Sequence, residues 1–406
     1  MIKLSKFSEL QSTDETFVNF GLQPISNRFL AADNPEEVPR YPIELCICKD
    51  TGIVYLARPF PIEELKPQYS WLTCFEPEDH LDDLVKVITK LPGINKNSIF
   101  GAYSFKDDST LERLNALNYS NTWRIDPVKQ LGVEDSCANV ETYQAAFNEE
   151  NAENIKQENG AADVLIVRHV VEHAYDISRF IKSLQKLVTK DGYIVWELPD
   201  CERPIALGDC TTIWEEHVYY FTSFTFKQLL LLAGQEIVHF ESVEYPLENS
   251  IIAITKMTEK NDFKLNPDDK LLQKEIQRAN SFAVAINQRK LILREKLEAI
   301  RAQGKTIALF GAGHLSIAFL SLMGITDLID CVLDDNDNKK GMKMPIGNLD
   351  IIDSEALYDQ DISVCLLSLN PQNQPKVIAK HQKYIDQGGV FASIFPGSNS
   401  YLEDIL

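Results

Sequence analysis

The residues best suited to chemistry lie in the stretch Ile213–Phe221, which reads IWEEHVYYF. Glu216, His217, Tyr219 and Tyr220 bring a carboxylate, an imidazole and two phenols together within five residues. Histidine is the usual general base near neutral pH because its ordinary pKa is about 6.5. Phenols can hydrogen-bond an oxygen on which negative charge develops. These residue types could therefore form a catalytic constellation, or the stretch could be a polar loop that is merely crowded.

A second candidate motif is H-x-x-E-H, formed by His169, Glu172 and His173. In inverted zincins the two histidines of this motif must share one face of a helix. His169, however, directly follows the apolar run VLIV and Arg168, a pattern that predicts the end of a strand. We therefore interpret the motif as unrelated to a metalloprotease and expect no metal among the site residues.

Composition narrows the classes of partner. The 406-residue chain has a formal net charge of −20 and a pI of about 4.8. Such an acidic surface repels phosphate backbones, so we expect no nucleic-acid partner. No apolar run reaches the length of a membrane helix, and the N-terminus lacks an apolar leader. We expect a cytoplasmic monomer or homodimer with free thiols and no membrane partner.

The apolar patterning predicts four parts. They are a small β-rich domain over 1–75, an α/β domain over 76–265, a connecting helix over 266–304 and a second α/β domain over 305–406. Short apolar runs alternate with helical periodicity in both α/β parts. This alternation predicts parallel, Rossmann-like sheets, so the expected fold class is α/β.

The second α/β domain opens with a candidate phosphate-binding turn. A buried strand, KTIALF, runs into Gly311-Ala312-Gly313 and then a helix. Glycines let the backbone approach a phosphate, and the N-terminus of the following helix attracts anions. Ser316 occupies the third glycine position of the dinucleotide motif, and the acidic pair Asp334-Asp335 ends the next strand where a ribose-binding acid is expected. The alternative is that these glycines serve only tight strand–helix packing.

Three segments in the right order resemble the sugar C-methyltransferases. These enzymes methylate a ring carbon next to the ketone of a nucleotide-linked deoxysugar. The N-terminal stretch FVNFGLQPISNRFL, the E-H-x-x-Y-F segment EEHVYYFTSFTF and the C-terminal stretch ALFGAGHLSIAFLSLMGI carry the resemblance. It implies a class I methyltransferase fold for the central domain and S-adenosylmethionine as its cofactor.

The resemblance also implies roles for particular residues. His217 would remove the proton next to the ketone, giving an enolate that attacks the cofactor's methyl group. Glu216 would tune the imidazole or contact the sugar, and Tyr219 and Tyr220 would hydrogen-bond the ketone or the developing enolate. Contacts to S-adenosylmethionine are expected from Asp108, Asp126, Arg168 and His169, and contacts to the nucleotide-linked sugar from Asn27, Tyr69, Gly311, Gly313, His314 and Ser316.

The family's N-terminal zinc site is altered in this sequence. It uses two C-x-x-C pairs, and alignment places the first near Lys6–Leu10, where no cysteine occurs. The second pair would fall at Cys48 and Thr51, so one ligand of four remains. Because structural zinc requires four good ligands, we expect no zinc.

The cofactor loop is altered as well. Tyr103 replaces the family's acidic residue, while Phe105 and Ser109 replace glycines. A phenylalanine where glycine allows close backbone approach is expected to crowd the methionine end of the cofactor.

Three functions therefore remain open. One is C-methyl transfer to a ketosugar. The second is a cofactor-independent epimerase or tautomerase that uses the same base. The third is a sugar-nucleotide-binding protein without catalysis.

Overall fold

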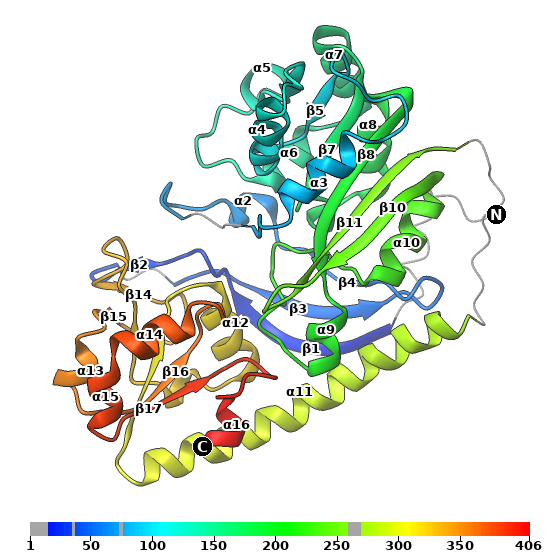
Figure 1. Ribbon diagram of the computed structural model, residues 1–406. Coiled ribbons are helices and arrows are strands. Elements are labelled where there is room, and N and C mark those ends of the chain that lie inside the picture. Colours follow the sequence, from blue (N-terminus) through cyan, green and yellow to red (C-terminus); the bar gives the residue numbers. More distant parts are fainter. Residues whose placement is uncertain (1–14, 35–36, 73–75, 259–268) are drawn as a thin grey trace.

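The computed structural model describes residues 15–34, 37–72, 76–258 and 269–406. Two α/β bodies flank an N-terminal sheet, and the long helix α11 (Lys270–Ala302) runs along that sheet to the C-terminal body (Figure 1). This helix is present where the connecting helix is predicted. No helix in these described ranges is long and apolar enough to cross a bilayer.

The N-terminal sheet is antiparallel and is completed by a distant segment. Its strands, in the order β1-β3-β4-β9, are β1 (Glu15–Pro24), β3 (Arg40–Ile47), β4 (Val54–Leu56) and β9 (Tyr219–Tyr220). Alternate residues of β3, such as Ile43 and Leu45, are buried in the core, as a half-covered strand requires. Strand β9 pairs with β4 through Tyr219 and Tyr220. The β-rich domain predicted over 1–75 therefore includes a strand from the middle of the chain.

The central sheet has the order β10-β11-β8-β7-β5-β6. Its strands are β5 (Phe100–Ala102), β6 (Thr122–Arg124), β7 (Ala162–Arg168), β8 (Val188–Asp200), β10 (Gln235–Val243) and β11 (Asn249–Met257). Strands β5 to β8 are parallel, whereas β11 runs antiparallel to both β8 and β10. The near-continuous burial of β7 fits a parallel strand covered on both faces. This α/β architecture confirms the expected fold class.

Helices cover the two faces of the central sheet. They are α3 (Leu81–Ile88), α4 (Asp108–Ala116), α5 (Pro127–Leu131), α6 (Val140–Ala146), α7 (Glu149–Asn159), α8 (Ile177–Lys186) and α10 (Ser223–Leu232). Helix α9 (Glu202–Leu207) instead packs against α11 (Figure 1). Short 3-10 turns, η3 (Phe105–Asp107) and η4 (Val171–His173), follow β5 and β7. These two turns lie at the carboxyl ends of parallel strands, where open α/β sheets bind ligands.

The C-terminal sheet is parallel, in the order β15-β13-β12-β16-β17. Its strands are β12 (Thr306–Phe310), β13 (Cys331–Leu333), β15 (Ile351–Ile352), β16 (Ile362–Leu367) and β17 (Val390–Ser393). The helices are α12 (His314–Met323), α13 (Ala356–Asp359), α14 (Gln374–Lys380), α15 (Gln382–Asp386) and α16 (Leu402–Ile405). Strand β12 lies between β13 and β16, so the strand order reverses next to the Gly-rich turn that follows β12.

The N-terminal segment also binds the C-terminal body directly. Strand β2 (Leu30–Ala31) pairs with β14 (Met342–Lys343), while α2 (Ile62–Leu65) packs near α6 of the central body. The N-terminal segment therefore contacts both α/β bodies.

Candidate active site

Two adjoining pockets lie where the three parts of the chain meet. The smaller, of about 620 Å³, is lined by the loops after β7 and β12 and by the segment around His217. The larger, of about 990 Å³, reaches the turn after β5 and the N-terminal domain. Nine residues line both pockets: Glu76, Glu78, Lys106, His173, Trp214, Glu216, Gly313, His314 and Lys339. The two pockets therefore form one continuous space large enough for two small molecules.

His217 lines the smaller pocket and is 8% exposed. Its ring lies parallel to the indole of Trp214, with 5.6 Å between ring centroids, and edge-on to His173 at 4.7 Å. Burial, together with the nearby His173 and Lys106, lowers the pKa of His217 well below its ordinary value. The imidazole is therefore neutral at physiological pH, which is the protonation state that a general base requires.

The backbone before β9 turns sharply and so separates neighbouring side chains. The Tyr220 hydroxyl donates to the Trp214 carbonyl at 2.8 Å, and the His217 amide donates to the same carbonyl at 3.1 Å. Glu216 lines both pockets, and burial, followed by the charge of Glu141, raises its pKa well above the ordinary range. Glu215 instead accepts two hydrogen bonds from the backbone and hydroxyl of Ser26, at 2.7 and 2.6 Å.

Neither Tyr219 nor Tyr220 lines these two pockets, although both were expected to contact the reacting oxygen. Both side chains are buried and belong to β9, where the strand pairing with β4 places them. The Tyr220 hydroxyl is engaged by the Trp214 carbonyl. Charge stabilisation at a reacting oxygen must therefore come from other groups.

His173 is a pocket residue whose role the sequence motif did not reveal. Its Nδ1 lies 2.5 Å from Glu141 Oε1, a contact that orients the ring. Its Nε2 is buried and has no hydrogen-bond partner among the described residues. Glu141 lies on α6, more than thirty residues before His173, so only the tertiary fold brings the pair together.

Arg168 and His169 were expected to bind the cofactor, and the structure engages both side chains in a buried ion-pair network. Arg168 Nε lies 2.5 Å and His169 Nε2 lies 3.0 Å from the carboxylate of Glu197. His80 Nε2 lies 3.1 Å from the same carboxylate. Burial alone would raise the pKa of Glu197, but the hydrogen bonds from His169 and His80 and the charge of Arg168 hold it well below its usual range. His169 adopts φ +49°, at the strand end that the sequence pattern predicts.

The turn after β5 has the register expected of the cofactor loop. Tyr103 follows β5 directly, and its ring packs edge-on against Phe147 and Phe180 in the core, away from solvent. Asp107 accepts hydrogen bonds from the amides of Tyr103, Ser104 and Arg168, while burial raises its pKa to about 7. Phe105 is 47% exposed and lines the larger pocket.

The two expected cofactor acids are placed differently. Asp108 lines the larger pocket and forms an ion pair of 2.7 Å with Arg124. Asp126 caps α5 by accepting from the amides of Val128 and Lys129, and it lines neither pocket. In this structure Asp126 is therefore a helix cap and does not face the pocket as expected.

The C-terminal wall of the smaller pocket contains half of the six residues expected to bind the substrate. Gly311, Gly313 and His314 line it, and Asn27 and Tyr69 line the larger pocket. Ser316, in contrast, is fully buried and caps α12 through hydrogen bonds with the backbone of Gly313. It therefore supports the turn without facing the pocket.

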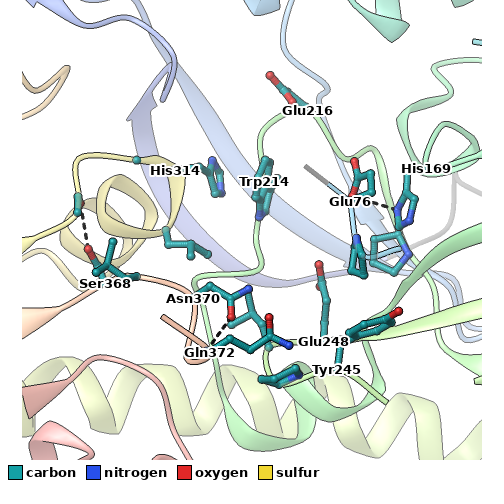
Figure 2. Close-up of a pocket in the computed structure, with 18 of the residues that line it drawn as sticks. Glu76, His169, Trp214, Glu216, Tyr245, Glu248, His314, Ser368, Asn370 and Gln372 are labelled. Carbon is teal, nitrogen blue, oxygen red and sulfur yellow. Dashed lines mark hydrogen bonds and ion pairs between the residues drawn. The ribbon is translucent and has the colours of Figure 1, made fainter. Parts of the chain in front are cut away.

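An aromatic stack connects the two α/β bodies across this wall. The rings of His314 and Trp214 lie 3.7 Å apart, and Figure 2 shows them face to face. His314 Nδ1 also lies 2.9 Å from the Ser26 hydroxyl and 3.5 Å from Glu215. Burial lowers the pKa of His314 to about 4, so this imidazole is neutral near pH 7.

Several pocket residues had no recognisable signal in the sequence. Figure 2 shows Glu76, Tyr245, Glu248, Asn370 and Gln372 around the same space as His169 and Trp214. They come from loops before α3, between β10 and β11, and after β16. Burial raises the pKa of Glu248 to about 8, and burial opposed by His169 and Lys106 leaves Glu76 with a pKa lowered to about 2. Asn370 and Gln372 follow the apolar strand β16, and this position is the one signal in the sequence that could have marked them as pocket residues.

The strand order of the central sheet, with a pocket at the carboxyl ends of β5 and β7, defines a class I methyltransferase fold. Residues 108–240 match the family described as a methyltransferase domain. Residues 257–396 match the C-methyltransferase C-terminal domain, and residues 11–65 match a putative zinc binding domain.

The chain is 21% identical over 389 residues to the C-methyltransferase NovU of Streptomyces niveus, an alignment that covers 93% of this chain and 92% of NovU. Together with the three domain matches, this similarity confirms the expected resemblance to the three-domain C-methyltransferases. The chain is thus an enzyme of the methyltransferase type.

Solved structures align only with part of the chain. A putative methyltransferase from Bacillus halodurans aligns with 45% of this chain and 100% of its own length, at 9% identity and a TM-score of 0.30. A SAM-dependent methyltransferase from Anabaena variabilis aligns with 43% of this chain and 84% of its own, at 13% identity and a TM-score of 0.29.

The match over residues 11–65 corrects the expectation of no zinc, since it identifies the N-terminal part as a putative zinc binding domain. Cys46 and Cys48 lie two residues apart on and just after β3, and both are buried. The position aligned with the first cysteine pair, Lys6–Leu10, lies outside the described residues. The absence of two C-x-x-C pairs was therefore not sufficient to exclude a zinc-binding domain.

Proposed function

We propose that this enzyme transfers a methyl group from S-adenosylmethionine to a carbon next to the ketone of a nucleotide-linked sugar, with His217 as the base. One observation carries the proposal: a neutral, buried imidazole faces a pocket between the cofactor edge of one α/β sheet and the Gly-rich turn of a second. The similarity to C-methyltransferase NovU supports the reaction class.

The larger pocket is suited to the cofactor. It lies at the carboxyl ends of β5 and β7, and its volume of about 990 Å³ is at the upper end of the roughly 300–1,000 Å³ typical of ligand pockets. Asp108, Ser109 and Asn139 would hold S-adenosylmethionine there, because they supply a carboxylate, a hydroxyl and an amide to the pocket wall. Asn139 also keeps a buried amide nitrogen with no partner in the described part of the chain. When bound, the cofactor supplies an electrophilic methyl group.

The nucleotide diphosphate would bind at the opposite wall. The turn Gly311–Gly313 opens α12, whose N-terminus attracts anions, and Lys339 adds a positive charge at the same wall. A sugar attached to that diphosphate would extend toward Trp214 and His217. His217 would remove the proton from the carbon next to the ketone. The raised pKa of Glu216 favours its protonated form, which can donate a hydrogen bond to the resulting oxyanion.

The test separates proton abstraction from binding. His217→Asn keeps a similar size but cannot accept the proton, so solvent deuterium exchange into a nucleotide-linked ketosugar should fall by about a hundredfold or more. Binding of the ketosugar, measured by calorimetry, should change little. His239→Asn, on the exposed strand β10, is the matched control and should behave as the unchanged protein. Normal exchange in His217→Asn would show that another group is the base.

S-adenosylmethionine binding distinguishes the alternatives. Calorimetric binding together with methyl transfer supports the methyltransferase. Deuterium exchange without cofactor binding would instead favour an epimerase or tautomerase, and ligand binding with neither activity would favour a sugar-nucleotide-binding protein.

A further inference from the structure

The proposed chemistry leaves one buried cluster unexplained. Glu172, His173 and His217 each bring a potential ligand atom to within 4.8 Å of the others. Glu172 is 2% exposed, and neither of its carboxylate oxygens has a hydrogen-bond partner within the described ranges. Glu172 Oε1 lies 3.8 Å from His169 Nδ1 and 3.9 Å from His173 Nε2, which is too far for a hydrogen bond. A bound cation is one way to compensate a buried carboxylate that lacks hydrogen bonds.

The geometry of the cluster matches a metal site. His173 Nε2, which also lacks a hydrogen-bond partner in the described structure, lies 3.9 Å from Glu172 Oε1. Two ligands of a tetrahedral ion with bonds of about 2.0–2.1 Å lie about 3.3 Å apart, so these two atoms must approach by about 0.6 Å to share an ion. A pair at the 4.8 Å limit of the cluster would have to approach by about 1.5 Å. Glu141 holds the other nitrogen of His173 and would fix the ring as second-sphere carboxylates do in metal sites.

We propose that Glu172, His173 and His217 form a binding site for a divalent transition-metal ion such as Zn²⁺ or Co²⁺. Two imidazoles and one carboxylate are the ligand set of catalytic zinc and non-haem iron sites and are less suited to Mg²⁺ or Ca²⁺. The site opens on the smaller pocket, so a water molecule or substrate oxygen can complete the coordination.

A metal ion at this site would compete with the catalytic step, an effect that rests on the proposed function. A metal ion takes the lone pair of the His217 nitrogen, and the same lone pair cannot then accept a proton from the substrate. Occupancy would therefore inhibit proton abstraction. The H-x-x-E-H motif thus supplies Glu172 and His173 as ligands, while His169 contacts Glu197 through Nε2 and Glu76 through Nδ1, at 3.0 and 3.4 Å.

The first experiment measures binding without any turnover. Co²⁺ titrated into the full-length, chelator-treated protein should give the visible absorption of a low-symmetry histidine–carboxylate site, with one ion bound in this cluster. Glu172→Gln and His217→Asn should each weaken that signal by at least about a hundredfold, because loss of even a second-sphere group costs about 10–100-fold. His239→Asn is the control and should bind normally.

The N-terminal zinc-type domain must be separated from this site. Thiolate ligands give cobalt an intense charge-transfer band, which a histidine–carboxylate site lacks, and Cys46→Ser with Cys48→Ser should leave the proposed signal unchanged. Thermal unfolding checks that each variant is folded. Absence of the histidine–carboxylate signal, or its survival in folded Glu172→Gln and His217→Asn, overturns the proposal.

A second experiment tests the consequence. Zn²⁺ should inhibit deuterium exchange into the ketosugar, and chelator should restore it. Inhibition that persists in a folded Glu172→Gln variant would show that zinc acts elsewhere. If the protein binds cobalt at the cluster but catalyses no exchange under any condition, the metal site stands while the proposed function fails.

Discussion

At the scale of single residues, the two glycines of the turn after β12 have different reasons to be glycine. Gly311 has φ +107°, and an added Cβ would lie 2.9 Å from Leu369 Cδ2. Gly313 is extended, at φ −146°, and an added Cβ meets no atom within 4 Å. Packing therefore explains Gly311 but not Gly313. Gly313 is the N-cap of α12, where glycine is a favoured residue, and the proposed phosphate site adds close approach of a ligand as a second reason.

This difference gives a paired prediction. Gly313→Val should keep the free energy of unfolding within about 1 kcal/mol, because helix N-caps without a side-chain bond change by about that much. It should nevertheless weaken nucleoside diphosphate binding about tenfold or more, as measured by calorimetry. Gly311→Val should lower the free energy of unfolding by about 1–3 kcal/mol, as measured with urea. Unchanged affinity in Gly313→Val would mean that the turn serves packing alone.

At the scale of elements, the turn from β5 to α4 differs most from a glycine-rich cofactor loop. The Ser104 hydroxyl accepts a hydrogen bond from the Lys106 amide, and Asp107 accepts from the Tyr103 and Ser104 amides. Side-chain hydrogen bonds thus fix the shape of this turn, whereas a glycine-rich loop depends on the wide range of backbone dihedral angles that glycine allows. The Phe105 ring, left half-exposed on the pocket wall, is the one large apolar group that this turn presents to a ligand.

Phe105→Gly tests whether this ring limits cofactor binding. Its removal should tighten S-adenosylmethionine binding by about tenfold, since the backbone and the pocket wall become accessible to the methionine end. Leu117→Ala, an equally exposed apolar residue at the C-terminal end of α4, is the control and should leave the affinity unchanged. Equal calorimetric affinities in Phe105→Gly and the unchanged protein would show that the ring lies clear of the cofactor.

At the scale of the whole molecule, the sequence predicts the individual strands and helices better than the contacts between the domains. Apolar runs such as β7 and β12 reveal parallel strands because burial on both faces requires continuous apolar residues. The pairing of β9 with β4 could not be predicted in this way, since a two-residue strand has no period. The His173–Glu141 contact and the Glu197 network depend on side chains that only the folded sheet brings together.

The three parts of the chain meet at His314, and this junction predicts a dependence of stability on pH. The ring stacks on Trp214 of the central body and lies 2.9 Å from the hydroxyl of Ser26 in the N-terminal domain. Burial lowers its pKa to about 4, against about 6.5 in the unfolded chain, while nearby Glu215 opposes the shift. Below pH 6.5 the unfolded chain therefore takes up a proton that the folded protein does not.

His314 should consequently reduce the free energy of unfolding as the pH falls from about 6.5 to about 4, by up to about 3 kcal/mol, and should have no such effect above pH 6.5. Urea unfolding of the unchanged protein and of His314→Asn, measured at several pH values, isolates this effect because asparagine does not titrate. The difference between the two free energies should be constant above pH 6.5 and should shift in favour of His314→Asn at lower pH. His239→Asn, at a histidine whose side chain is 28% exposed beside Glu241, controls for histidine loss in general. A His314→Asn difference that stays constant down to pH 4 would mean that the junction opens enough for the imidazole to be protonated normally.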